Sequence, residues 1–160
     1  MLATAPSIDT GQAISELSVQ IFQLSSQLLA WGDRFVAPDG LTSARWQMLG
    51  AIALAGAPQT APQIAARMGT TRQGAQKQIK LLLADGLLEA QENAAHMRSP
   101  LYSLTPQGAA VYERVHARWQ AQAAAWGAGL EAGDVAAAAR VLKHLSQEIS
   151  AHESQEYQEK

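Results

Sequence analysis

The stretch that most constrains the fold of this chain runs from residue 70 to residue 105. Its first half predicts a helix, because apolar Ala75, Ile79 and Leu82 recur at spacings of four and three and therefore share one helical face. Thr70 or Thr71 can cap this helix with its hydroxyl oxygen. Asp85 and Gly86 end it, since glycine tolerates the left-handed turn that follows a last helical residue.

The second half of the same stretch predicts two short strands, at residues 87–90 and 101–104. A polar loop at residues 91–99 separates them and carries His96 and Arg98. A helix followed by a hairpin with a basic tip is typical of a winged helix. The predicted fold class is therefore mostly α with a small β-hairpin wing.

The polar face of the predicted helix carries no carboxylate before Asp85. Its residues are Arg72, Gln73, Gln76, Lys77 and Lys80. Glutamine can pair with adenine in the major groove, while arginine and lysine reach guanine or phosphate. The pattern favours a recognition helix for double-stranded DNA, and a solvated face that merely lacks acids is the alternative.

The charge of the whole chain argues against binding by bulk electrostatic attraction. Twelve Lys and Arg residues stand against fourteen Asp and Glu residues, for a net charge of −2. This is not the basic excess typical of a protein held to DNA by charge alone. Residues 61–105 nevertheless hold five cations against three acids. Any contact with nucleic acid must therefore be local.

Several classes of protein are disfavoured by what the sequence lacks. There is no cysteine, which excludes disulfides and thiolate metal sites. The four histidines are dispersed, and no phosphate-binding loop, nucleophile elbow or HExxH motif occurs. We expect no metal, no cofactor and no enzymatic activity. Neither a signal peptide nor an apolar run long enough for a bilayer is evident, so we expect a cytoplasmic protein with no membrane partner.

Amphipathic helices are predicted at both ends of the chain. Apolar residues alternate at spacings of three and four from residue 14 to residue 31, as in a coiled-coil seam. Thr105-Pro106 is a strong helix start, and two further striped helices follow it, interrupted at residues 127–133. The stripes comprise Ile14, Leu17, Ile21, Leu24, Leu28 and Trp31 in the first helix, Val111, Val115, Trp119, Ala123 and Trp126 in the second, and Val135, Ala138, Leu142, Leu145 and Ile149 in the third.

A helix-turn-helix is predicted between these end regions. One helix opens at residues 41–43, and a short helix at residues 61–68, capped by Thr60, precedes the recognition helix. The predicted organisation is a mobile tail at residues 1–9, a helical dimerisation region at 10–37 and 106–157, and a DNA-binding lobe at 38–105. The apolar stripes favour a homodimer clasped by its N- and C-terminal helices, and the alternative is an intramolecular bundle in a monomer.

These features together resemble the MarR (multiple antibiotic resistance regulator) family of winged helix-turn-helix transcription factors. The resemblance covers about residues 12–150 and is carried by residues 63–68, 71–73, 85–88 and 98–108, together with Leu41-Thr42, Trp46, Leu49 and Leu82. It implies a homodimer with intertwined end helices. It also implies a pseudo-palindromic operator whose successive major grooves receive the two recognition helices, and we expect a repressor.

We assign DNA contacts to nine residues on this basis. Gln73, Gln76 and Lys77 are expected near base edges, and Arg72 and Lys80 nearer to phosphates. Hydroxyls and amides at Thr60, Thr70 and Thr71 are expected to contact the DNA backbone. The resemblance places Arg98 in the minor groove, where narrow A·T-rich segments attract a cation.

Two positions of the DNA-binding lobe are unusual. His96 stands where the family usually has an acid that fixes the wing arginine, so we expect a less rigid and more pH-sensitive wing. Gly74 lies inside the recognition helix at a cost of about 1 kcal/mol relative to alanine. It either allows a close approach to the bases or is simply tolerated.

The resemblance also implies a small aromatic or phenolic effector that binds between the dimer helices and the DNA-binding lobe and releases DNA. The candidate residues are Trp31, Trp46, Tyr112 and His116. The alternative is that the tryptophans belong to the core and His116 to the surface. An alternative for the whole chain is a ligand-binding or protein-binding adaptor with weak or lost DNA binding.

Overall fold

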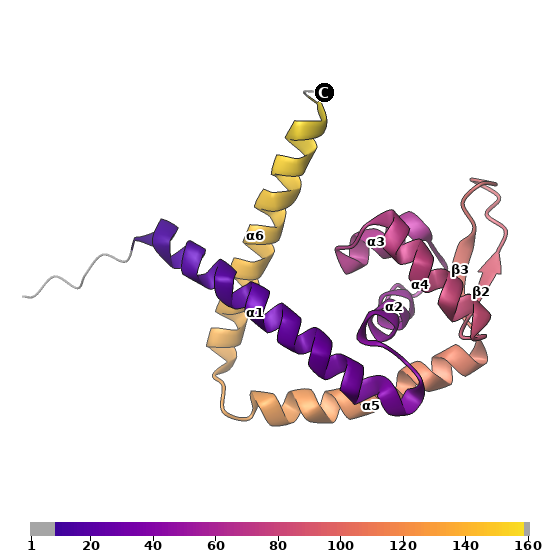
Figure 1. Ribbon diagram of the computed structural model, residues 1–160, viewed down its shortest axis with the longest axis horizontal. Coiled ribbons are helices and arrows are strands. Elements are labelled where there is room, and N and C mark those ends of the chain that lie inside the picture. Colours follow the sequence, from indigo (N-terminus) through magenta and orange to yellow (C-terminus); the bar gives the residue numbers. More distant parts are fainter. Residues whose placement is uncertain (1–8, 159–160) are drawn as a thin grey trace, which may run out of the picture. The chain divides into compact units, whose positions relative to one another are not determined.

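The computed structural model describes residues 9–158 and is mostly helical, with one small antiparallel sheet (Figure 1). The elements in chain order are α1 (Thr10–Val36), the 3-10 helix η1 (Ala37–Asp39), α2 (Ser43–Ala53), β1 (Gln59–Thr60), α3 (Ala61–Met68), α4 (Arg72–Ala84), β2 (Leu88–Gln91), β3 (Leu101–Leu104), α5 (Pro106–Gly127) and α6 (Ala132–Gln158). The predicted winged helix is confirmed. The predicted tail lies outside the described residues, apart from Asp9, whose carboxylate accepts a hydrogen bond from the Gly11 N–H at 2.9 Å and caps α1.

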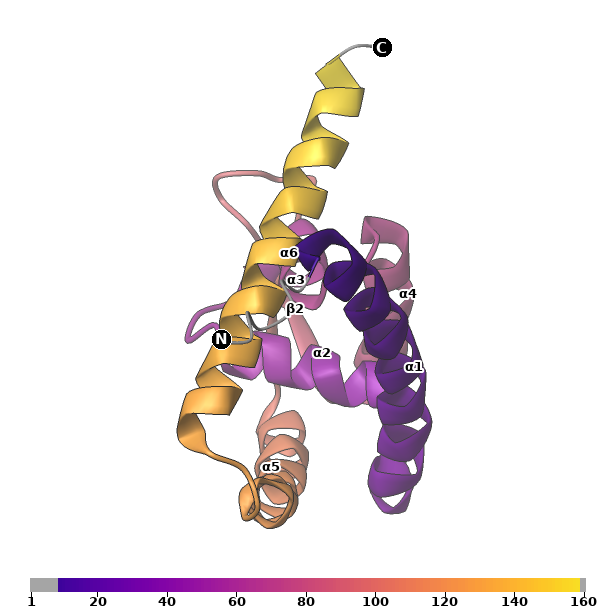
Figure 2. The same cartoon turned by 90° about the vertical axis from the view of Figure 1, so that its left-hand side faces the viewer.

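The chain forms two compact units that divide within α5, Met1–His116 and Ala117–Lys160. In the first unit, α2 packs against α1, α3, α4 and β3, and Figure 2 shows it running crosswise to α1. The core of this unit is apolar and fully closed to solvent at its centre. Its largest fully buried side chains are Met48, Leu49, Ile64, Leu82, Val36 and Val115.

Local sequence determines where α3 and α4 begin and end. The Thr60 hydroxyl and the Gln63 side chain cap the start of α3 reciprocally, which satisfies two otherwise unpaired backbone N–H groups. Gly69 ends α3 in the left-handed region, at φ +58°. Thr71 caps α4 by accepting a hydrogen bond from the Gly74 N–H at 3.0 Å. The tight turn between the two caps fixes the angle at which α4 leaves α3.

The sheet has three strands in the order β1-β3-β2, all antiparallel. Leu88 pairs with Leu104 and Gln91 with Leu101 in the hairpin, and Gln59 pairs with Tyr102 on the other side of β3. Sequence analysis predicted the hairpin but missed β1. Two residues are too few to display the alternation that marks a strand.

A close backbone contact holds the start of α5 against the base of the hairpin. A Cβ on Gly108 would lie only 2.0 Å from the Leu87 carbonyl oxygen, so any side chain there would displace α5. The Thr105 hydroxyl donates to the Gly86 carbonyl at 2.7 Å and accepts from the Gly108 N–H at 3.0 Å. The predicted helix start at Thr105-Pro106 therefore also anchors the wing.

The second unit contains the end of α5 and the last helix, α6. Trp119 and Trp126 pack edge to face in α5, with ring centroids 5.7 Å apart. The predicted interruption is confirmed, because α5 ends at Gly127 and α6 begins at Ala132.

Both end helices expose large apolar side chains. In α1 these are Val19, Phe22, Leu24, Leu28 and Leu29, and in α6 they are Val135, Val141, Leu142 and Ile149. Leu24, Leu28, Val135, Leu142 and Ile149 belong to the predicted stripes. Within the described residues, no helix is both long and apolar enough to cross a membrane.

Candidate nucleic-acid interface

Helix α4 has two chemically distinct faces. Ala75, Ile79 and Leu82 are buried and attach the helix to the core of the first unit. The predicted DNA-contacting residues all lie on the exposed side: Arg72, Gln73, Gln76, Lys77 and Lys80. The polar side chains that could contact bases and phosphates are therefore exposed to solvent, while the buried face of α4 holds the helix against the core.

The start of α4 combines exposed threonines with an exposed helix N-terminus that Thr71 caps. Thr70 and Thr71 are exposed, and the first turn contains no acid. The N-terminus of a helix carries a partial positive charge, which favours a phosphate in that position. The Thr60 hydroxyl already donates to the Gln63 Oε1 at 2.9 Å, and the Thr71 Oγ1 accepts from the Gly74 N–H at 3.0 Å. A contact of either threonine with DNA would therefore have to share an existing cap.

Gly74 is packed against the threonines that open α4. A Cβ at this position would lie 3.0 Å from the Thr70 Oγ1 and 3.2 Å from the Thr71 Oγ1. Both distances are shorter than ordinary van der Waals contact. The sequence suggested that Gly74 either allows a close approach to the bases or is simply tolerated. The structure adds another reason, because glycine leaves room for the two threonine hydroxyl groups.

The wing loop is organised by one side chain, Asn93. Its Nδ2 donates to the Ser99 carbonyl at 2.9 Å, and its Oδ1 accepts from the Ala95 N–H at 3.2 Å. Two backbone hydrogen bonds complete the loop, from the His96 N–H to the Asn93 carbonyl and from the Ser99 N–H to the His96 carbonyl. Sequence analysis missed Asn93, although asparagine commonly bonds to its own backbone two residues on. His96 and Arg98 themselves are exposed.

The carboxylates near this surface are largely engaged within the protein. Asp85 forms an ion pair with Arg45 of α2. The Glu89 Oε1 accepts from the Ser103 hydroxyl at 3.1 Å across the hairpin. Pairing of this kind weakens the repulsion that these acids would exert on a phosphate backbone.

The four candidate effector residues fall into two aromatic stacks. Phe35, which sequence analysis did not single out, stacks on Trp31 with ring centroids 4.6 Å apart and lies 5.5 Å from Trp46. Tyr112 stacks on His116 at 5.2 Å, and burial raises the pKa of the Tyr112 hydroxyl above its ordinary value. Phe35, Trp46 and Tyr112 also pack against the buried core. The structure therefore gives the Trp46 and Tyr112 rings a packing role against the core, and Trp31 stacks on Phe35.

Potential metal ligands do not gather in the part of the chain that the structure describes, since no group of three or more His, Asp or Glu side chains could hold an ion. His144 and Glu148 approach to 3.8 Å as an exposed pair one turn apart on α6.

Comparison with known proteins places this geometry in a family. The model of the MarR family matches residues 39–99, which run from the end of η1 to the wing loop. An uncharacterized protein of Mycobacterium tuberculosis is 37% identical over 105 residues, covering 66% of this chain and 72% of the relative.

Two solved structures share the fold. The M. tuberculosis transcriptional regulator MosR, in complex with DNA, is 25% identical with a TM-score of 0.69, over 84% of this chain and 96% of that one. Staphylococcus aureus MarR, in complex with salicylate and kanamycin, is 19% identical with a TM-score of 0.73, over 86% and 93%, which is a likeness of fold alone. The chain described here therefore belongs to the MarR family of winged-helix transcription regulators.

Proposed function

We propose that this protein regulates transcription by binding a pseudo-palindromic operator as a homodimer, and that it acts as a repressor. The observation that carries the proposal is the exposed face of α4, which presents glutamines and cations and has no acid before Asp85. Glutamine and lysine at the centre of such a helix read base edges when the helix enters a major groove. The DNA complex of MosR supports the same use of the fold.

The residues divide into three roles in this proposal. Gln73, Gln76 and Lys77 contact base edges, and Arg72 and Lys80 neutralise phosphates on either side. Thr60, Thr70 and Thr71 hydrogen-bond the DNA backbone. Arg98 enters the minor groove from the wing, where a cation gains from the narrow groove's negative potential.

The homodimer is supported by the apolar surface that α1 and α6 expose. Phe22 is 74% exposed, and Ile149 is 61% exposed. Extended apolar surfaces of this kind generally mark a protein interface. Two copies joined through these helices present two α4 helices to one duplex, which matches a two-fold operator.

A small aromatic acid as releasing effector is the second part of the proposal. It is supported by the salicylate complex of S. aureus MarR. The candidate residues are Trp31, Trp46, Tyr112 and His116, of which Trp46 and Tyr112 also pack against the core. Salicylate titrated into the protein–operator complex should release DNA and change tryptophan fluorescence together. A panel of aromatic acids that moves neither signal would reject this part alone.

Fluorescence anisotropy on an operator selected from a randomised duplex pool tests the DNA-binding function. Gln76→Ala should reduce the preference for the selected duplex over a scrambled one, whereas Gln120→Ala, on exposed α5 surface, should not. Affinity should fall steeply with salt, because bound phosphates release counterions. Equal, salt-independent affinity for both duplexes would favour the adaptor alternative.

A further inference from the structure

Met97 is an unusual side chain for the tip of a polar loop. It is 87% exposed, more than any other large apolar side chain among the described residues, whereas Met48 is fully buried and Met68 half-buried. An isolated apolar side chain at a loop tip gains nothing from folding, because its surface stays in water. Its thioether is therefore open both to dissolved oxidants and to a surface that the loop tip contacts.

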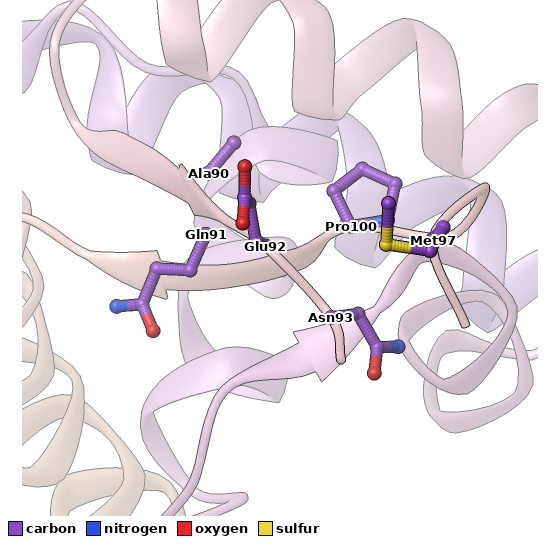
Figure 3. A pocket seen from close by; sticks show the side chains of 6 residues that line it. All are labelled: Ala90, Gln91, Glu92, Asn93, Met97 and Pro100. Carbon is purple, nitrogen blue, oxygen red and sulfur yellow. The ribbon is translucent and has the colours of Figure 1, made fainter. Parts of the chain in front are cut away.

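The loop holds Met97 in a defined place. Asn93 braces the loop at Ser99 and Ala95, so the segment between them is not free to fold back. Figure 3 shows the Met97 side chain beside Pro100. Both residues line a hollow of about 300 Å³, together with Asn93, Ala90 and Glu92. Arg98 follows Met97 directly in the chain. The thioether thus stands at the same tip as the proposed minor-groove cation.

We propose that Met97 is an oxidation site, at which a peroxide converts the thioether to a sulfoxide and weakens operator binding. In the reaction, a lone pair of the Met97 sulfur attacks the distal peroxide oxygen and the O–O bond breaks. Hydroxide leaves and takes the proton of the oxygen that is now bound to sulfur, so that hydrogen peroxide is reduced to water while the sulfur gains one oxygen atom and loses two electrons. The chain has no cysteine to compete for the oxidant.

The consequence for DNA binding follows from the change in polarity. Methionine is among the apolar side chains that contact or wedge between bases in the minor groove. The sulfoxide is polar and keeps its hydration, so the apolar contact is lost while Arg98 remains. Loss of about half the burial of a methionine side chain corresponds to a roughly threefold to tenfold weaker affinity. This inference rests on the proposed function, since it requires the wing to touch DNA.

The experiment treats the full-length protein with hydrogen peroxide and measures its affinity for the selected operator by anisotropy. Wild-type protein should lose about threefold to tenfold in affinity, and methionine sulfoxide reductase should restore it. Met97→Leu keeps an apolar side chain without sulfur and should bind before and after peroxide alike. Met97→Gln should resemble the oxidised wild type without treatment. Peptide mass spectrometry locates the added oxygen.

Three other outcomes would contradict the proposed role of Met97. An equal loss in Met97→Leu would place the sensitive site elsewhere, and unchanged binding by protein oxidised at Met97 would overturn the inference while leaving the proposed function intact. If untreated wild-type protein does not prefer the operator, the proposed function fails and this inference fails with it.

Discussion

Helix α4 and the wing would meet the same DNA, but the protein holds them in place by different means. Ala75, Ile79 and Leu82 of α4 are almost completely inaccessible to solvent, so burial of apolar surface sets the position of the helix. The wing tip contains no buried side chain between residues 89 and 100, and hydrogen bonds from Asn93 shape it. The helix is therefore expected to resist surface substitution, whereas the wing depends on a few polar contacts.

Because α4 is held by the core and the wing by local hydrogen bonds, substitutions in the two elements should affect protein stability and DNA affinity differently. A core substitution in α4 should lower the stability of the whole first unit, because α2, α3 and β2 all pack against this helix. A substitution in the wing should alter local order and DNA affinity while leaving global stability nearly unchanged.

The largest effect is expected from Leu82→Ala. Removing a fully buried leucine side chain should lower the free energy of unfolding by about 2–5 kcal/mol. Leu81→Ala is the matched control, because Leu81 is the neighbouring residue and is 44% exposed, and it should cost less than about 1 kcal/mol. Urea denaturation of both variants checks the expectation, and equal losses would contradict the assigned faces of α4.

Arg98→Ala should weaken operator binding by about 1–3 kcal/mol with no measurable change in unfolding. The reason is that Arg98 is exposed and contributes charge to the wing tip. Arg34→Ala removes another exposed cation, at the end of α1 and outside its apolar stripe, and serves as the control in the same anisotropy titration. Comparable losses in both variants would mean that charge anywhere on the surface suffices.

Asn93→Ala should loosen the wing without unfolding the protein. Loss of the bond to the Ser99 carbonyl should cost about 1 kcal/mol of local order. Amide hydrogen exchange at His96 and Ser99 should therefore become faster, while exchange at Ile79 stays slow. Glu92→Ala, at the adjacent exposed position, is expected to leave all three amides unchanged.

The smallest effect is expected for Gly74→Ala. Alanine gains about 1 kcal/mol in helix propensity, but its Cβ would crowd the hydroxyls of Thr70 and Thr71. The two effects oppose each other, so the net change in stability should be small. In a Thr70→Ala background the same substitution should stabilise more, and strict additivity in thermal denaturation would argue against the crowding.

Sequence reasoning succeeded where local chemistry decides the structure. Thr60 caps α3 and a threonine, Thr71, caps α4 as short-range patterns suggested, and Gly86 adopts the left-handed turn that follows α4. The burial of Ile79 and Leu82 followed from helical spacing alone. These features depend on residues only a few positions apart.

Features that depend on distant partners were missed. Strand β1 forms only because β3, some forty residues later, offers an edge to Gln59 and Thr60. Phe35 joins Trp31 to Trp46 across two helices, and Arg45 meets Asp85 from a separate element. Asn93 was also missed, although its hydrogen bonds are local. The loop contains several polar residues, and residue type alone does not show which of them forms these bonds.

The central claim is that two copies of α4 read one duplex through Gln76 and Lys77. Hydroxyl-radical footprinting of the selected operator tests it most directly. The account predicts two protected segments about ten base pairs apart, related by the two-fold symmetry of the site, and their loss with Gln76→Ala and Lys77→Ala combined. A single protected segment, or a footprint that the double variant leaves unchanged, would contradict it.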